Sequence, residues 1–143
     1  MASTFTYHLP NLRHKGPICK VLLKASEPTI QKLKVEKKKV ANQHVRALID
    51  TGASATAISR RVAKALKLVA RGTVKVYTSS KGFEMRNEYD ISMAFDKTTR
   101  LTILKVLEAN FQDMNIDCLI GRDVLEHAVF AYDGPKKVVT LSF

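Results

Sequence analysis

The sequence predicts an all-β fold, a small closed barrel or sandwich of short strands with a short helix in each half. Apolar residues alternate with polar ones through much of the chain, which is typical of strands with one buried face. Clusters of Gly, Pro, Asn and Ser interrupt these runs at short intervals, and helical spacing is confined to short stretches. The length of 143 residues and the apolar content of 45% fit one globular domain over residues 1–143.

The first half of the chain is predicted to hold several strands and one helix. STFTYHLP is expected to be a strand that stops at its proline, and PNLRHKGP a loop. A second strand is expected over Ile18–Ala25, after which SEPT interrupts the pattern. LKVEKKKVANQHVRALID predicts two strands around a turn at residues 42–43, the second running into Asp50. From Ile58 the spacing becomes helical, so SRRVAKALKL predicts a short helix that ends before Gly72.

The second half is predicted to begin with a long hairpin. Its arms are TVKVY and the alternating run from Met85 to Phe95, and its turn is TSSKG, where Gly82 can adopt positive φ. TRLTILKVLEA, IDCLIG and the C-terminal KKVVTLSF predict three more strands, and RDVLEHA predicts one or two helical turns. Strand–DTG–loop–helix and strand–LIGRD–helix therefore indicate two halves of one design.

The chain is strongly basic, with 24 Lys and Arg against 13 Asp and Glu and a formal charge of +11. This excess favours an acidic partner through a salt-dependent field. The densest run, KLKVEKKK, is interpreted as a solvated strand and turn whose lysines discourage edge pairing. No apolar run is long enough for a membrane span and no signal peptide is recognisable, so we expect a cytoplasmic protein. Cys19 and Cys118 are expected to be free thiols.

Several kinds of chemistry have no support in the sequence. The four histidines are scattered, so neither a metal site nor any other cofactor is expected. Ser54 lies outside a G-x-S-x-G motif, which argues against a serine hydrolase. A phosphate-binding G-x-x-x-x-G-K-[ST] loop is also missing from the sequence, and the basic runs lack interleaved aromatic residues for stacking bases.

Asp50 is the candidate functional residue because it ends an apolar strand and is followed at once by Thr51 and Gly52. A carboxylate in that position pays a desolvation penalty unless hydrogen bonds satisfy it. The hydroxyl of Thr51 and the flexible backbone at Gly52 can provide them. The alternative is an Asp that only starts a turn and caps the next segment, and the tripeptide alone leaves both interpretations open.

The ordered set of motifs resembles the retropepsins, the short retroviral type of aspartic protease. LIDTGA, which ends at Ala53, is similar to their active-site signature, and CLIGRDVL to their second signature, with Gly121, Arg122 and Asp123. KGFEMRNEYDISMAF resembles the second arm of their flap hairpin. STFTYHLP and TLSF are similar to the terminal strands by which two subunits pair. The flap tip implied by the resemblance consists of Ser79, Ser80, Lys81 and Gly82.

The resemblance implies an aspartic endopeptidase that acts on peptides or proteins as a homodimer. This chemistry needs two carboxylates that share a proton, and the chain offers one D-T-G, so Asp50 of a second copy is expected to supply the other. Thr51 would brace the two loops, and Gly52 and Ala53 would support the site. Ser54 stands where viral enzymes often carry an acid that pairs with the helix arginine, so Arg122 needs another partner. The C-terminal strand is expected to be an unpaired edge in a single chain.

Two other functions remain open at this point. The tip has one glycine where viral flaps are glycine-rich, so a catalytically silent fold that binds peptides or an acidic partner is one alternative. A basic β-barrel that binds nucleic acid, with Asp50 purely structural, is the other.

Overall fold

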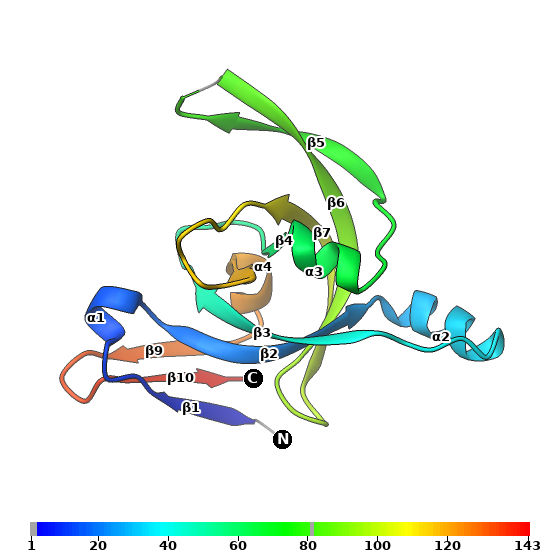
Figure 1. Ribbon diagram of the computed structural model, residues 1–143. Helices are drawn as coiled ribbons and strands as arrows, with labels where there is room; N and C mark the ends of the chain where they lie inside the picture. Colours follow the sequence, from blue (N-terminus) through cyan, green and yellow to red (C-terminus); the bar gives the residue numbers. More distant parts are fainter. Residues whose placement is uncertain (1–2, 81) are drawn as a thin grey trace.

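The computed structural model describes residues 3–80 and 82–143, which form mostly β structure with short helices (Figure 1). In chain order the elements are β1 (Thr4–His8), α1 (Leu12–Lys15), β2 (Ile18–Ala25), α2 (Glu27–Val35), β3 (Asn42–Ile49), β4 (Ala57–Ser59), α3 (Arg60–Ala65), β5 (Gly72–Thr78), β6 (Gly82–Ala94), β7 (Arg100–Ala109), β8 (Cys118–Ile120), α4 (Arg122–Leu125), β9 (Val129–Asp133) and β10 (Val138–Ser142). The prediction of a mostly β chain is confirmed.

The larger sheet has seven strands in the order β2-β3-β8-β4-β7-β6-β5, and β2 also pairs with β6. Most neighbours are antiparallel, but β3 runs parallel to β8 and β4 parallel to β7. Ile49 lies opposite Ile120 in the β3–β8 pair, so the two strands end side by side. The two predicted halves therefore meet at this edge. The finer expectation of a closed barrel stays a prediction.

The smaller sheet consists of β1, β10 and β9, all antiparallel, with β10 in the middle. The expectation that the C-terminal strand is an unpaired edge in a single chain is therefore wrong. The chain supplies both neighbours itself, because β9 and β10 form a hairpin that the sequence pattern did not reveal. Val139 and Leu141 of β10 are fully buried, and the ring of Phe143 packs against Phe95 with centroids 4.9 Å apart.

The lysine-rich segment differs from its prediction as a strand. Residues Glu27–Val35 form α2, and the expected turn at residues 42–43 is instead the start of β3. Pro28 occupies the first turn, where its missing N–H costs nothing, and Glu27 provides an acid near the positive end of the helix. Ile30 is the buried residue of α2. Helix propensity of Lys, Leu and Gln over several residues outweighs the short alternation that suggested a strand.

Other local differences are small. The predicted loop PNLRHKGP contains the single turn α1, whose Leu12 is buried. β4 has only three residues and was not predicted, because so short a strand gives no periodic signal. α3 begins as expected after Ser59, whose hydroxyl accepts a hydrogen bond of 3.2 Å from the Val62 N–H.

The predicted hairpin is confirmed as β5 and β6, paired from Gly72 opposite Glu88 to Thr78 opposite Gly82. Its outer end extends away from the rest of the sheet (Figure 1). Gly82 has φ of +78°, as its sequence position predicts, whereas Lys81 lies outside the described residues. In the described part of the chain, no helix is long and apolar enough to cross a membrane.

Candidate active site

Asp50 lies directly after β3, at the edge where β3 and β8 end together. Its backbone N–H donates to the Ile120 carbonyl over 2.9 Å, which extends the β3–β8 pairing by one residue. Its Oδ1 accepts a hydrogen bond of 2.8 Å from the Gly52 N–H. The residue is half-buried, while Thr51 and Gly52 are exposed. The carboxylate is thus held by its own loop at a surface that solvent or a substrate can reach.

Gly121 permits the close approach of the two motifs, and Gly52 a tight contact within the Asp50 loop. A Cβ on Gly121 would lie 2.6 Å from the carbonyl carbon of Ala55, a distance that real Cβ atoms do not reach. A Cβ on Gly52 would lie 3.2 Å from Oδ1 of Asp50. The Arg122 N–H donates to the Ala53 carbonyl over 2.8 Å across the same contact. The backbone of the second motif is therefore packed directly on the loop that follows Asp50.

Asp123 is turned toward this loop and is fully engaged there. Its Oδ2 accepts from the Thr56 N–H at 2.9 Å, and its Oδ1 accepts from the Thr56 hydroxyl at 2.7 Å. Oδ1 also accepts from the Val124 N–H at 2.9 Å, and the Thr56 oxygen accepts in turn from the Gly121 N–H at 3.1 Å. Thr56 is completely buried. Asp123 therefore fixes the far end of the Asp50 loop.

Arg122 holds the near end of the loop. Its Nη1 donates to the carbonyl oxygen of Thr51 over 2.7 Å. The sequence indicated that this arginine needs a partner other than an acid at position 54, and the partner is a backbone carbonyl. Asp50, Thr51, Gly52, Ala53, Gly121, Arg122 and Asp123, all predicted as site residues, are brought together by these contacts.

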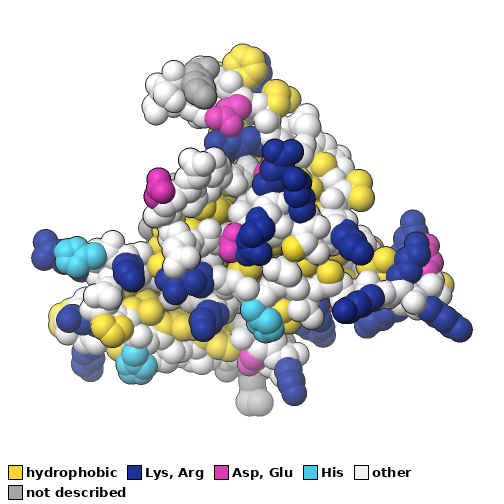
Figure 2. Space-filling view, viewed as in Figure 1, with side chains coloured by type: hydrophobic (Ala, Val, Ile, Leu, Met, Phe, Trp, Pro, Cys, Tyr) yellow, Lys and Arg dark blue, Asp and Glu magenta, His cyan; other side chains and the backbone are white. Residues whose placement is uncertain are grey.

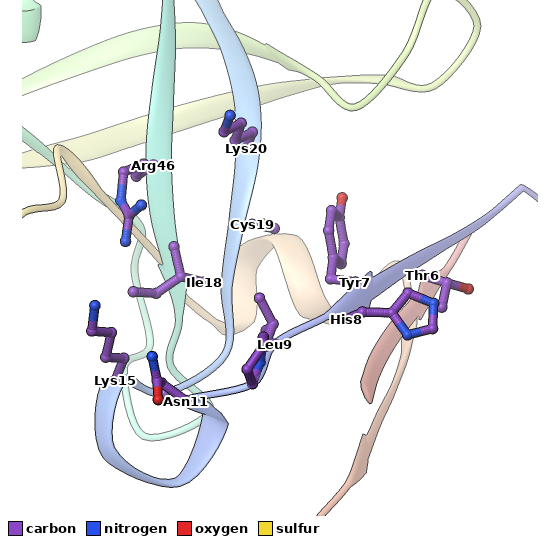
Figure 3. Close-up of a pocket in the computed structure, with 12 residues that line it drawn as sticks. Thr6, Tyr7, His8, Leu9, Asn11, Lys15, Ile18, Cys19, Lys20 and Arg46 are labelled. Carbon is purple, nitrogen blue, oxygen red and sulfur yellow. The ribbon is translucent and has the colours of Figure 1, made fainter. Parts of the chain in front are cut away.

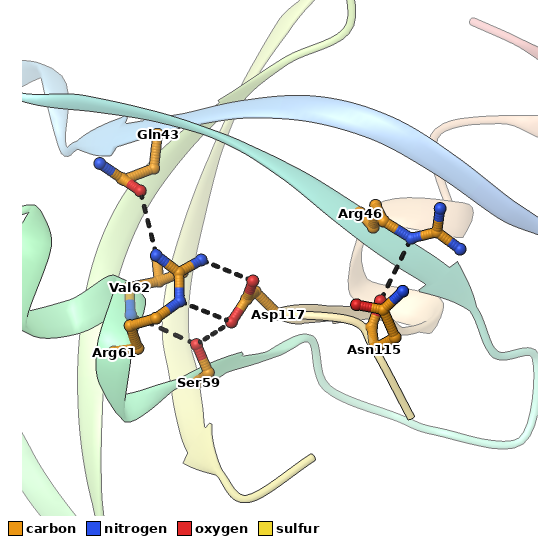
Figure 4. Close-up of polar contacts among 7 residues, drawn as sticks. All are labelled: Gln43, Arg46, Ser59, Arg61, Val62, Asn115 and Asp117. Atoms are coloured by element: carbon orange, nitrogen blue, oxygen red, sulfur yellow. Dashed lines mark hydrogen bonds and ion pairs between the residues drawn. The ribbon is translucent and has the colours of Figure 1, made fainter. Parts of the chain in front are cut away.

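A polar network missed by the sequence analysis lies at the start of β8, at the other end of this strand from Asp50 (Figure 4). Asp117 accepts hydrogen bonds from the Ser59 hydroxyl at 2.8 Å and from Arg61 Nε at 3.2 Å, and it forms an ion pair with the same guanidinium. These bonds, that of Arg61 foremost, lower the pKa of Asp117 below its ordinary value of 3.8. The network ties α3 to the segment before β8. Its partners are 56 and 58 residues apart, so no local signal could have revealed it.

The predicted flap residues lie apart from this cluster. Ser79, Ser80 and Gly82 are exposed at the outer end of the β5–β6 hairpin. Behind the tip, Nζ of Lys75 lies 4.1 Å from the centre of the Phe83 ring. The hairpin thus exposes apolar side chains near its end, including Tyr77 and Phe83.

A separate cavity of about 410 Å³ lies between β1, α1 and β2, lined by residues that include Tyr7, Cys19 and Arg46 but not Asp50 (Figure 3). Burial raises the pKa of Cys19 to about 12, so its thiol stays protonated and is a poor nucleophile. Cys19 and Cys118 are both buried free thiols. Within residues 3–80 and 82–143, no group of three or more His, Cys, Asp or Glu is placed to hold a metal ion.

The site thus consists of a D-T-G loop held by a Gly-Arg-Asp turn at the end of two parallel strands. Both motifs lie within a segment that matches a known family. The model of the aspartyl protease family matches residues 36–124, more than half of the chain, so the protein belongs to that family.

Among solved structures, the chain is similar to a retropepsin-like aspartic protease from Rickettsia conorii. The match has 16% sequence identity and a TM-score of 0.59, and it covers 100% of this chain and 92% of the other. This likeness supports the retropepsin-like fold. No curated protein sequence matches the chain.

Proposed function

We propose that the protein is an aspartic endopeptidase of the retroviral type, in which a homodimer brings together Asp50 of each chain. The observation that carries the proposal is the different use of the two motif carboxylates. Asp50 is accessible and is held only lightly by its own loop, whereas both oxygens of Asp123 are occupied by Thr56. Asp123 is therefore unsuited to be the second catalytic acid, and a second Asp50 is the natural source.

In this mechanism a water molecule lies between Asp50 and its counterpart, which share one proton. The ionised carboxylate takes a proton from the water as its oxygen attacks the peptide carbonyl carbon, and the protonated carboxyl gives its proton to the carbonyl oxygen. The resulting tetrahedral intermediate then loses the amine, which leaves with a proton from the dyad. Gly52 and Arg122 act here only through the loop, by fixing where the Asp50 carboxylate points.

The strands that have a free edge indicate where a dimer contact can form. Because β10 already has β1 and β9 as neighbours, exchange of the C-terminal strand would first have to displace one of them. We propose instead that two Asp50 loops face each other, with β1 or β9, the edge strands of the small sheet, beside them. Free, buried Cys19 and Cys118 are compatible with a reducing compartment such as the cytoplasm, where we place the activity.

A mixing experiment tests both the carboxylate and the dimer. Wild-type protein is combined with increasing amounts of the Asp50→Asn variant, and cleavage of a peptide library is measured from acidic to neutral pH, with and without a pepstatin-type inhibitor. If each site needs two Asp50 carboxylates, the variant alone is inactive. An excess of it also suppresses the wild type, because wild-type chains enter mixed dimers.

A matched control is Asp113→Asn, the same chemical change on an exposed residue, which should not suppress wild-type activity. Undiminished wild-type cleavage in an excess of Asp50→Asn would contradict the shared site. Activity of the Asp50→Asn variant near the wild-type level would contradict the aspartic mechanism itself.

A further inference from the structure

The lysine-rich α2 and its surroundings form a second surface feature that the proposed catalytic site does not use. α2 connects β2 to β3 and projects beyond the end of these strands (Figure 1). Residues 32–39 hold five lysines and a single acid, Glu36, which pairs with Lys38 at 3.1 Å. Dark blue side chains gather over this end of the molecule in Figure 2. The positive charge is thus concentrated and only slightly neutralised.

A groove of about 1070 Å³ runs beside α2, between this helix and the segment that follows α3. We call it the α2 groove. Its apolar lining includes Ala25, Leu33, Val40, Ala41, Leu66 and Val69. Ala25 and Leu66 are buried, whereas Val69 is 88% exposed. The apolar lining therefore includes both core residues and a side chain in contact with solvent. Because burial of apolar surface is favourable, a partner that covers this exposed valine would bind more tightly.

The lining of the α2 groove also includes four lysines, Lys32, Lys38, Lys39 and Lys67, which we call its basic rim, and we call the apolar lining residues its floor. The side chains of Lys32, Lys39 and Lys67 are exposed and form no ion pair within the described part of the chain. Glu36 is the acid among the lining residues. A ligand therefore meets an apolar floor between unpaired positive charges.

These features together select one kind of ligand. Nucleic acid fits poorly, because none of the described lining residues is aromatic and an apolar floor offers nothing to phosphates. A bilayer surface is flat and cannot fill a concave groove. A peptide that carries both carboxylates and apolar side chains satisfies the rim and the floor at once.

We propose that the α2 groove binds an acidic peptide segment of a partner protein, in which apolar side chains alternate with carboxylates. The groove lies on residues other than those of the Asp50 loop, so this binding does not depend on the proposed proteolysis. The proposal assigns part of the net charge of +11 to a specific binding surface.

The test uses the full chain with Asp50→Asn, so that the probe stays intact, and a fluorescently labelled peptide of alternating Glu and Leu. Fluorescence anisotropy should detect binding that weakens as salt is added. Combined replacement of Lys32, Lys39 and Lys67 by Gln should weaken binding about tenfold, since each exposed charge pair contributes only a fraction of that effect. These lysines carry no ion pair, so the variant should fold normally, which circular dichroism would verify.

The matched control replaces Lys15, at the end of α1, and Lys136 and Lys137, between β9 and β10, by Gln, an equal loss of charge. α1 and the β9–β10 turn lie at the end of the molecule opposite α2 (Figure 1). This control should bind the peptide within about twofold of the parent protein, because its lysines lie outside the α2 groove. Equal weakening by both triple variants would overturn the proposal, since only net charge would then matter.

Two further peptides test the floor and the rim separately. Gln in place of Glu should abolish binding, and Ser in place of Leu should weaken it strongly. A Glu–Ser peptide that binds as well as the Glu–Leu peptide would overturn the role of the apolar floor. Tighter binding of single-stranded DNA or of phosphatidylserine vesicles, lost in the Lys32, Lys39 and Lys67 variant, would assign the groove to those ligands instead.

Discussion

Asp50 and Asp123 each follow a strand of the parallel β3–β8 pair, but the protein uses the two carboxylates in different ways. Both acids are half-buried. After β3, one oxygen of Asp50 accepts a hydrogen bond from the Gly52 N–H of its own loop. After β8, both oxygens of Asp123 accept hydrogen bonds from the buried Thr56, one from its N–H and one from its hydroxyl. The half that ends in α4 therefore acts as the support of the half that presents the acid. The comparison teaches that a carboxylate placed after a strand can be left available for chemistry or used as a structural acceptor, depending on which groups its oxygens bond.

The largest expected effect on stability comes from filling the contact between the halves. Gly121→Val should lower the free energy of unfolding by about 4 kcal/mol or prevent folding, because its Cβ would overlap the backbone of Ala55. Thermal denaturation measures this. Gly134→Ala is the control, since its Cβ would lie 3.6 Å from Tyr132, an ordinary contact. Similar melting temperatures for the two variants would mean that the halves are not closely packed.

Replacing each of the two acids separately gives the next largest effect. Asp123→Ala should cost about 2–3 kcal/mol, because the buried N–H and hydroxyl of Thr56 lose their acceptor. Asp50→Asn should change the stability little while it abolishes cleavage. Urea unfolding and peptide cleavage, measured on both variants, separate the two roles. A large loss of unfolding free energy in Asp50→Asn, or no loss in Asp123→Ala, would contradict the roles assigned to the two acids.

The hairpin provides a matched pair of glycines. Gly82→Val should cost about 1–2 kcal/mol and slow turnover, because φ of +78° is unfavourable for a β-branched residue although the space around it is open. Gly72→Val, at the other end of the same strand pair and also in open space, should be close to neutral. Steady-state kinetics and thermal unfolding test both. Equal kinetics for the two variants would argue against the tip as a moving flap.

The smallest effect concerns acid stability through Asp117. Because its pKa is lowered in the folded chain, its contribution is present above the ordinary value of 3.8 and is lost as the pH falls toward the folded value. Arg61 is largely exposed, so solvent screening keeps the contribution below about 1 kcal/mol. The unfolding free energies of wild type and Asp117→Asn should therefore differ at neutral pH and converge below pH 3.8. A constant difference across that range would exclude this linkage.

Local sequence was sufficient for most strands and for the position of the candidate acid. Alternation along β6 predicted a strand, although only its inner half, from Tyr89, is buried, and D-T-G after an apolar run required a turn with a carboxylate at its start. Gly82 needed positive φ and has it. Each of these features depends on residues that are close together in the sequence, which is why the sequence revealed them.

Local patterns misjudged the segments whose conformation depends on other rules. The lysines of α2 alternate with Leu and Val over too few residues to distinguish a strand from a helix. Helix propensity favoured the helix, and Pro28 and Glu27 suit its first turn. The C-terminal strand has the pattern expected of an edge but lies in the centre, because β9 pairs with it. A strand gives the same alternation whether one or both of its neighbours are present.

The sequence by itself determined that a single acid ends an apolar strand, that a second Gly-Arg-Asp motif follows later, and that positive charge is concentrated between residues 32 and 39. Only the tertiary structure decided which acid has both oxygens bonded to the buried Thr56 and which lysines border a groove. The bonds from Thr56 to Asp123 join residues 67 positions apart, and the α2 groove joins β2, α2 and the segment after α3. Such contacts arise when the chain packs, because hydrogen bonds and burial depend on proximity in space and leave no periodic trace in the sequence.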